Sequence, residues 1–258
     1  MIDSRRILLV AQWSVSQLVW SSRTLAMGIL AATPVLAALV YRAAVAIDLA
    51  LPTSGYGVFS VLTATVSFPF VAPMLSLFYA SGVTSDDVEA GTMPYFLTRP
   101  VSRSDFLLGK MLGTLTVALL LFVPPFVICY YVTLAPGGFR EVGVRFPVLM
   151  QDVLAALLGL FAYNGLFALA GTVVRRPLLV SLFFAFGWQA GASIVPGSVR
   201  YFTVTHYLHS LLPHESVGGV LASLIGKQSS TAESVLALFL IGLASHVAAL
   251  RVFARKEL

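Results

Sequence analysis

The chain has 258 residues, of which 58% are hydrophobic and only 10% are charged, with a formal net charge of +5. A soluble domain typically carries about 25% charged residues, so this composition excludes an ordinary soluble domain and predicts an integral membrane protein. The positive charge does not indicate nucleic acid, because in a membrane protein the placement of Lys and Arg matters more than their sum. The single cysteine, Cys129, excludes a disulfide framework or a cysteine-rich metal site.

The first 24 residues predict a helix that lies at the membrane surface. Polar residues interrupt the apolar run after Arg5 and Arg6, and no small-residue cleavage site follows, so a cleavable signal peptide is not expected. Trp13 and Trp20 are seven residues apart, which places them on one helical face. An amphipathic helix with its aromatic rings near the lipid headgroups fits this pattern.

Six apolar segments are long enough to cross a hydrocarbon core about 30 Å thick. They cover residues 25–47, 57–83, 105–133, 148–174, 177–197 and 232–252. The segments are continuously apolar and do not alternate, so they predict an all-α polytopic membrane protein and not a β-barrel. The whole chain, residues 1–258, is then a single transmembrane domain, with a long external loop over residues 198–231 that has room for short helices.

The distribution of basic residues predicts the orientation. With the N-terminus inside, the inner side would hold eleven Lys and Arg residues and the outer side five. The five are Arg42, Arg140, Arg145, Arg200 and Lys227. Both termini are therefore expected in the cytoplasm, and residues 84–104 form a cytoplasmic loop between the second and third spans.

This loop has more definition than a plain linker. Asp86, Asp87 and Glu89 suit the start of a short helix, where the helix dipole favours negative charge. Pro100 disfavours helical geometry at Arg99 and separates this helix from the next span. Ser102 or Ser104 is expected to cap that span, with Asp105 in its first turn.

The same loop resembles the first cytoplasmic loop of type-two ABC transporter permeases. The matching residues are Glu89, Gly91, Thr92, Leu97, Pro100, Val101, Ser102, Arg103, Gly109 and Lys110. Pro94 departs from the usual leucine-rich piece, which leaves the detailed contact geometry open. Six spans, an interfacial N-terminal helix and a long loop before the last span also match the family plan.

The resemblance implies the membrane subunit of an ATP-driven transporter, with an exporter expected in a bacterial cytoplasmic membrane. ATP and magnesium would bind a separate cytoplasmic ABC ATPase, and a second permease chain, identical or different, would complete the unit. The chain itself contains no Gly-x-x-x-x-Gly-Lys-Ser/Thr phosphate loop. The residues expected to contact the ATPase are Glu89, Gly91, Thr92, Tyr95, Phe96, Arg99 and Arg103.

Two other functional classes remain open from the residues. A membrane enzyme is one, because His206, His209, His214 and Glu215 lie together in the external loop, although solvated or headgroup-facing histidines are the expectation. An ATP-independent channel or secondary transporter is the other, but the central spans hold almost no ionisable residues to couple ion movement.

The polar groups at depth in the spans are Asn164, Trp188 and Gln189. They are candidates for a substrate path, although hydrogen bonding between helices is the commoner role of a buried amide. The cargo itself is not predicted.

Overall fold

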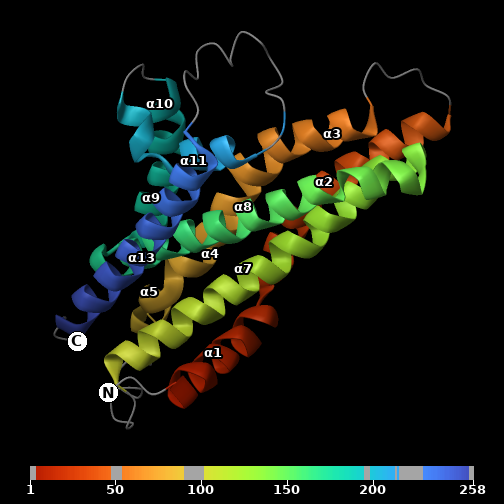
Figure 1. Cartoon of the computed structure of the whole chain (residues 1–258). Helices are drawn as coiled ribbons and strands as arrows, with labels where there is room; N and C mark the ends of the chain where they lie inside the picture. The colour runs from red at the N-terminus through yellow and green to blue at the C-terminus, as the bar shows by residue number, and fades with distance from the viewer. Residues whose placement is uncertain are drawn as a thin grey trace.

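Two long helices, α7 (Arg103–Leu134) and α8 (Gly138–Val173), pack on each other near the turn that joins them and diverge toward their other ends (Figure 1). The computed structural model describes residues 4–47, 54–89, 102–194, 198–212, 214 and 229–255. Within these ranges every regular element is a helix. This is the expected solution for apolar segments, since a helix satisfies its backbone hydrogen bonds without water.

The remaining helices surround this pair. Before α7 come α1 (Ser4–Val19), α2 (Ser22–Ala46), α3 (Gly55–Leu62), η1 (Thr63–Val71), α4 (Ala72–Ala80) and α5 (Gly82–Glu89). After it come the short turn η2 (Ala135–Gly137), then α8, α9 (Pro177–Leu182), η3 (Phe183–Trp188), α10 (Gln189–Ile194), η4 (Ser198–Phe202), α11 (Val204–Leu211) and α13 (Thr231–Arg255). α1 and α2 pack on α7, α13 packs on α8, and α4 contacts both central helices.

Five helical segments are long and apolar enough to cross a membrane. They are Ser22–Ala46, Gly55–Asp86, Arg103–Leu134, Arg140–Val173 and Thr231–Arg255. Each overlaps a segment predicted from the sequence, and α8 begins ten residues earlier than the predicted span at 148. The predicted span at 177–197 is different, because only Pro177–Trp188 forms an apolar helix there and it is shorter than the other five. Six spans are therefore not confirmed.

The second span is continuous but changes its helical period. Its middle, η1, is a π-helix that contains Pro69, and Pro73 follows at the start of α4. A proline lacks the amide hydrogen and its ring clashes with the preceding turn, and a wider π turn accommodates both effects. In α2 and α7, by contrast, the α-helix continues through Pro34 and through Pro124 and Pro125.

Small residues allow α8 and α13 to approach closely. A Cβ atom at Gly165 of α8 would lie 2.5 Å from Nδ1 of His246, and one at Gly242 of α13 would lie 2.5 Å from the Phe161 ring. His246 stacks on Phe161 with ring centroids 4.7 Å apart, and its Nδ1 lies 2.8 Å from the Gly242 carbonyl oxygen. Small residues at helix contacts are typical of membrane bundles, where packing replaces the hydrophobic effect.

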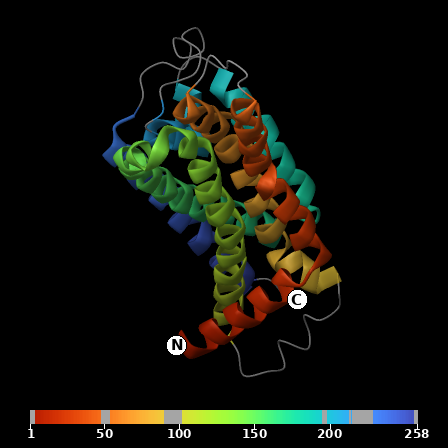
Figure 2. The same cartoon turned by 90° about the vertical axis from the view of Figure 1, so that its right-hand side faces the viewer.

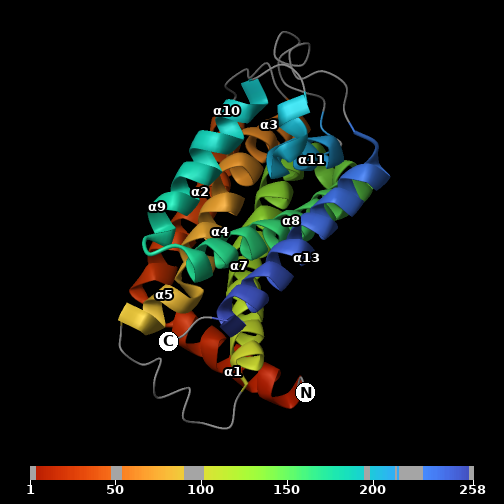
Figure 3. The same cartoon turned by 90° about the vertical axis from the view of Figure 1, so that its left-hand side faces the viewer.

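The bundle has two distinct ends. We call the end that carries α1, α5 and the last turn of α13 the α1 end, and the opposite end, which carries α10 and α11, the α11 end (Figures 1 and 3). The segment from α9 to α10 runs between them alongside the other helices (Figure 3). The described parts of α1 and α13 that lead to the two termini thus share one end.

The N-terminal helix lies across the base of α7 (Figure 2). Ser14 is buried, whereas Leu8 and Leu9 are 59% and 65% exposed, so one side packs on the bundle and another stays uncovered. α1 ends at Val19, which leaves Trp20 beyond the helix and 90% exposed. The expectation that Trp13 and Trp20 share a helical face is therefore wrong, and the interfacial position of α1 stays a prediction.

Candidate coupling site at the α1 end

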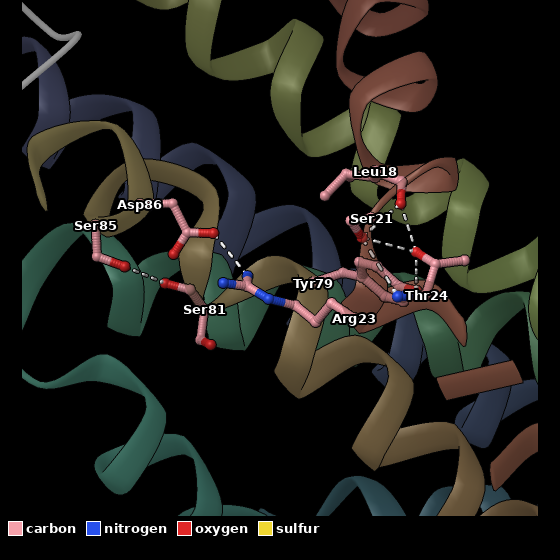
Figure 4. A network of polar contacts seen from close by, with 8 residues as sticks. All are labelled: Leu18, Ser21, Arg23, Thr24, Tyr79, Ser81, Ser85 and Asp86. Carbon is pink, nitrogen blue, oxygen red and sulfur yellow. Dashed lines mark hydrogen bonds and ion pairs between the residues drawn. The ribbon is translucent and has the colours of Figure 1, made fainter. Parts of the chain in front are cut away.

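The helix α5, which leads into the loop that was singled out in the sequence, is attached to two other helices. The Thr84 hydroxyl donates a hydrogen bond to the Gly171 carbonyl of α8 at 2.8 Å. Arg23 at the start of α2 pairs with Asp86, with 2.7 Å between Nη1 and Oδ2 (Figure 4). A Cβ at Gly171 would lie 2.5 Å from the Ser81 carbonyl oxygen, so the backbones are in close contact. α5 is therefore in direct contact with both α2 and α8.

The turn between α1 and α2 is fixed by side-chain hydroxyl groups (Figure 4). Ser21 caps α2, because its Oγ accepts the Thr24 amide at 3.3 Å, and it also donates to the Leu18 carbonyl at 2.7 Å. The Thr24 hydroxyl bonds to the same carbonyl and to the Tyr79 hydroxyl of α4 at 2.8 Å. These contacts join the end of α1, the start of α2 and the second span at one point.

The start of α7 follows the predicted cap. The Ser102 Oγ accepts the Asp105 amide at 3.1 Å, which confirms Ser102 as the capping residue. Asp105 is fully buried, and among the described residues neither carboxylate oxygen has a hydrogen-bond partner. Placement in the first turn of a helix is favourable for this negative charge.

One turn further, α7 presents a groove of small residues to α1. A Cβ at Gly109 would lie 2.6 Å from the Val10 Cβ, and one at Gly113 would lie 2.7 Å from the Ser14 Cβ. Between them Lys110 is 9% exposed, with its Nζ 5.9 Å from the Trp13 ring centroid. The Gly-Lys end of the loop motif thus positions α1 against α7.

A protein-family comparison matches the description "ABC-2 family transporter protein" over residues 6–258. This chain belongs to the ABC-2 transporter family. The comparison with curated proteins found no match. An ABC-2 permease is the multi-pass membrane subunit of an ABC transporter, and such permeases generally work with an ABC ATPase and often with a second permease chain.

In this ABC-2 permease the predicted contact residues are only partly within the described ranges. Glu89 is the last residue of α5, and Arg103 is the first residue of α7. The other five, Gly91, Thr92, Tyr95, Phe96 and Arg99, lie outside the described residues. The structure therefore places the two helices that enter and leave the loop, and the contacts of the loop remain a prediction.

The three predicted path residues make different contacts in this permease. Asn164 is fully buried and donates from Nδ2 to the Thr114 hydroxyl of α7 at 3.0 Å. The Gln189 Oε1 accepts the Thr205 hydroxyl at 2.8 Å, while Trp188 is 41% exposed. The two amides bond to neighbouring elements, which is the commoner role of buried amides. Their part in a substrate path is untested.

Two of the histidines that the sequence analysis placed in an external loop are at least partly buried. His206 is 8% exposed and its Nε2 lies 3.1 Å from the Ser229 hydroxyl. His209 is partly buried on α11, and burial lowers its pKa. Within the described residues, which exclude Glu215, no group of three or more His, Cys, Asp or Glu side chains could hold a metal ion.

The sequence analysis did not predict a buried pair of polar side chains at the α11 end. The His214 Nε2 lies 3.0 Å from the Asp152 Oδ2, and both side chains are almost completely buried. The Tyr56 hydroxyl lies 3.4 Å from the His214 Nδ1, and the Arg145 guanidinium covers the Tyr56 ring at 3.7 Å. The sequence signal was the Asp152 carboxylate within an apolar run, and this pattern does not identify the residue that pairs with it. The pair joins His214 to Asp152 of α8.

Proposed function

We propose that this chain is the permease of an ATP-driven exporter and that residues 84–104 transmit the closing motion of a separate ABC ATPase to the spans. The match to the ABC-2 transporter family over residues 6–258 carries this proposal. The partner supplies ATP and magnesium chemistry, and the permease acts as a pair of identical or different chains. Both termini face the cytoplasm of a bacterial cell, in line with the bias of eleven basic residues against five.

The attachment of α5 supports the mechanical part of the proposal. A force on the loop reaches α2 through Arg23 and Asp86, and it reaches α8 through Thr84 and Gly171. At the other end of the loop, α7 carries α1 in the groove at Gly109. One docking event at the loop would therefore move the elements that enter the membrane at the α1 end, which is the requirement for opening a path between chains.

The test is copurification of the tagged chain from its native membranes with any ATP-binding protein. Glu89→Arg reverses the charge at the end of α5, so the ATPase is expected to be lost or its hydrolysis to become uncoupled. Gln12→Arg is the matched control, because it adds positive charge to an exposed position of α1 at the same end. A Glu89→Arg complex with normal ATPase content and normal hydrolysis would contradict the proposal.

A further inference from the structure

A cavity of about 320 Å³ opens at the α1 end between α2, α5 and the turn that joins α8 to α9. Its charged lining consists of Arg23, Arg175, Arg176 and Asp86. Among the described residues the lining thus holds three guanidinium groups and one carboxylate, and that carboxylate is already paired with Arg23 at 2.7 Å. The volume is at the lower end of the range of small-molecule sites.

The two remaining arginines are the source of the excess positive charge. Arg175 and Arg176 are exposed, and neither forms an ion pair or a side-chain hydrogen bond with another described residue. Guanidinium groups match the geometry of phosphate oxygens and bind them with paired hydrogen bonds. The cavity is therefore suited to a phosphate group more than to a neutral ligand.

The depth of the cavity in the bundle indicates where that phosphate comes from. Arg23 is the second residue of α2, Asp86 ends the second apolar segment, and Arg175 and Arg176 directly precede α9. The charged lining thus lies where apolar helices begin or end, which is the level of lipid headgroups in a membrane protein.

The apolar part of the lining is arranged for an acyl chain. Leu178 and Leu179, which follow the arginines in α9, line the same cavity and are 43% and 57% exposed. A lipid would place its phosphate on the arginines and its chain along these leucines. A water-borne acidic peptide would leave the leucines uncovered.

We propose that this cavity binds the phosphate headgroup of an anionic phospholipid from the leaflet at the α1 end. Arg175 and Arg176 bind the phosphate, and Arg23 stays shared with Asp86. The inference rests on the chain lying in a bilayer, and it does not depend on the ATPase coupling proposed above.

The test is native mass spectrometry of the full chain released from bilayers of mixed phosphatidylglycerol and phosphatidylcholine. The wild-type protein should retain phosphatidylglycerol in preference, and Arg175→Gln with Arg176→Gln should weaken this retention on the order of tenfold. Arg251→Gln with Arg255→Gln is the matched control, since it removes the same charge from exposed positions of α13 at the same end of the bundle. This control should retain the lipid as the wild type does.

Four outcomes would overturn the inference. One is equal retention of the two lipids by the wild type, and another is equal loss of phosphatidylglycerol in both double variants. The other two come from additional arms of the experiment. Inorganic phosphate that displaces the lipid completely would show a site for the free anion. An ATPase that is lost only from the Arg175/Arg176 variant, with lipid retention unchanged, would assign this surface to a protein partner.

Discussion

At the scale of single residues, glycine placement decides how closely α1 can lie on α7. Gly109 has no room for a methyl group, because its Cβ would lie 2.6 Å from the Val10 Cβ and 2.8 Å from the Ile7 carbonyl oxygen. Gly28 in α2 has nothing within 4 Å of the same position. An alanine at Gly109 therefore changes both packing and helix propensity, whereas an alanine at Gly28 changes helix propensity alone.

Gly109→Ala is expected to destabilise the purified chain, because overpacking a close contact costs about 1–3 kcal/mol. Gly28→Ala should leave stability unchanged or raise it by up to about 1 kcal/mol, the difference in helix propensity. Thermal unfolding of both variants in detergent, followed by fluorescence-detected size exclusion, gives the comparison. Equal melting temperatures for the two variants would show that α1 is not held in this groove.

The buried pair at the α11 end also belongs to the residue scale. His214→Ala leaves the buried Asp152 carboxyl group without its partner at 3.0 Å, and a buried polar group without a hydrogen-bond partner costs about 1–3 kcal/mol. Asp152→Ala with His214→Ala should cost less than the sum of the single variants, since neither polar group is then left without its partner. Melting temperatures of the three variants check this. Strictly additive losses would mean that the two side chains act independently.

At the scale of elements, the Arg23–Asp86 pair links α2 to α5, the helix that enters the loop proposed to contact the ATPase. Both side chains are nearly half exposed, at 45% and 42%, so the pair contributes at most about 1 kcal/mol to stability. Asp86→Arg should therefore leave the melting temperature almost unchanged but lower the ATPase activity of the copurified complex. Arg23→Asp combined with Asp86→Arg should restore that activity. Failure of the reversed pair to restore it would exclude this contact as a coupling element.

The short helix α11 gives the protein a pH dependence. Burial lowers the pKa of His209, so in the folded state this side chain takes up its proton at a lower pH than in the unfolded state. Stability is unaffected above the unfolded value of about 6.5 and falls as the pH drops below it, because the unfolded chain binds more protons. His209→Gln should reduce the loss of melting temperature between pH 7 and pH 5. An identical loss in the variant would contradict this assignment.

The elements themselves were largely predictable, and their partners were not. Five apolar segments and the Ser102 cap follow from length and local chemistry, which act within a few residues. The Arg23–Asp86 and Asp152–His214 contacts join residues 63 and 62 positions apart, and no local pattern specifies such pairs. The predicted span at 177–197 is not confirmed, because the apolar helix Pro177–Trp188 is shorter than the other five, although α10 continues the helical segment to Ile194.

At the scale of the whole molecule, the exposed surface requires a bilayer. Large apolar side chains such as Leu25, Val40 and Phe183 are 70%, 71% and 72% exposed on the flanks of the bundle. So much exposed apolar surface is unfavourable in water, whereas lipid or a second permease chain would cover it. In the bilayer the α1 end faces one side of the membrane, and the distribution of basic residues predicts that this side is the cytoplasm.

Cysteine labelling tests both this orientation and the number of crossings. Cys129 is 1% exposed and gives a low background that Cys129→Ala would remove. Ala254→Cys and Arg176→Cys lie at the α1 end and should react with an impermeant maleimide only after the cells are opened.

Tyr201→Cys, beyond α10, should react in intact cells if α9 to α10 completes a sixth crossing. Labelling of Tyr201→Cys only in opened cells would contradict a crossing between Arg176 and Tyr201. Labelling of Ala254→Cys in intact cells would reverse the orientation and remove the loop at 84–104 from contact with a cytoplasmic ATPase.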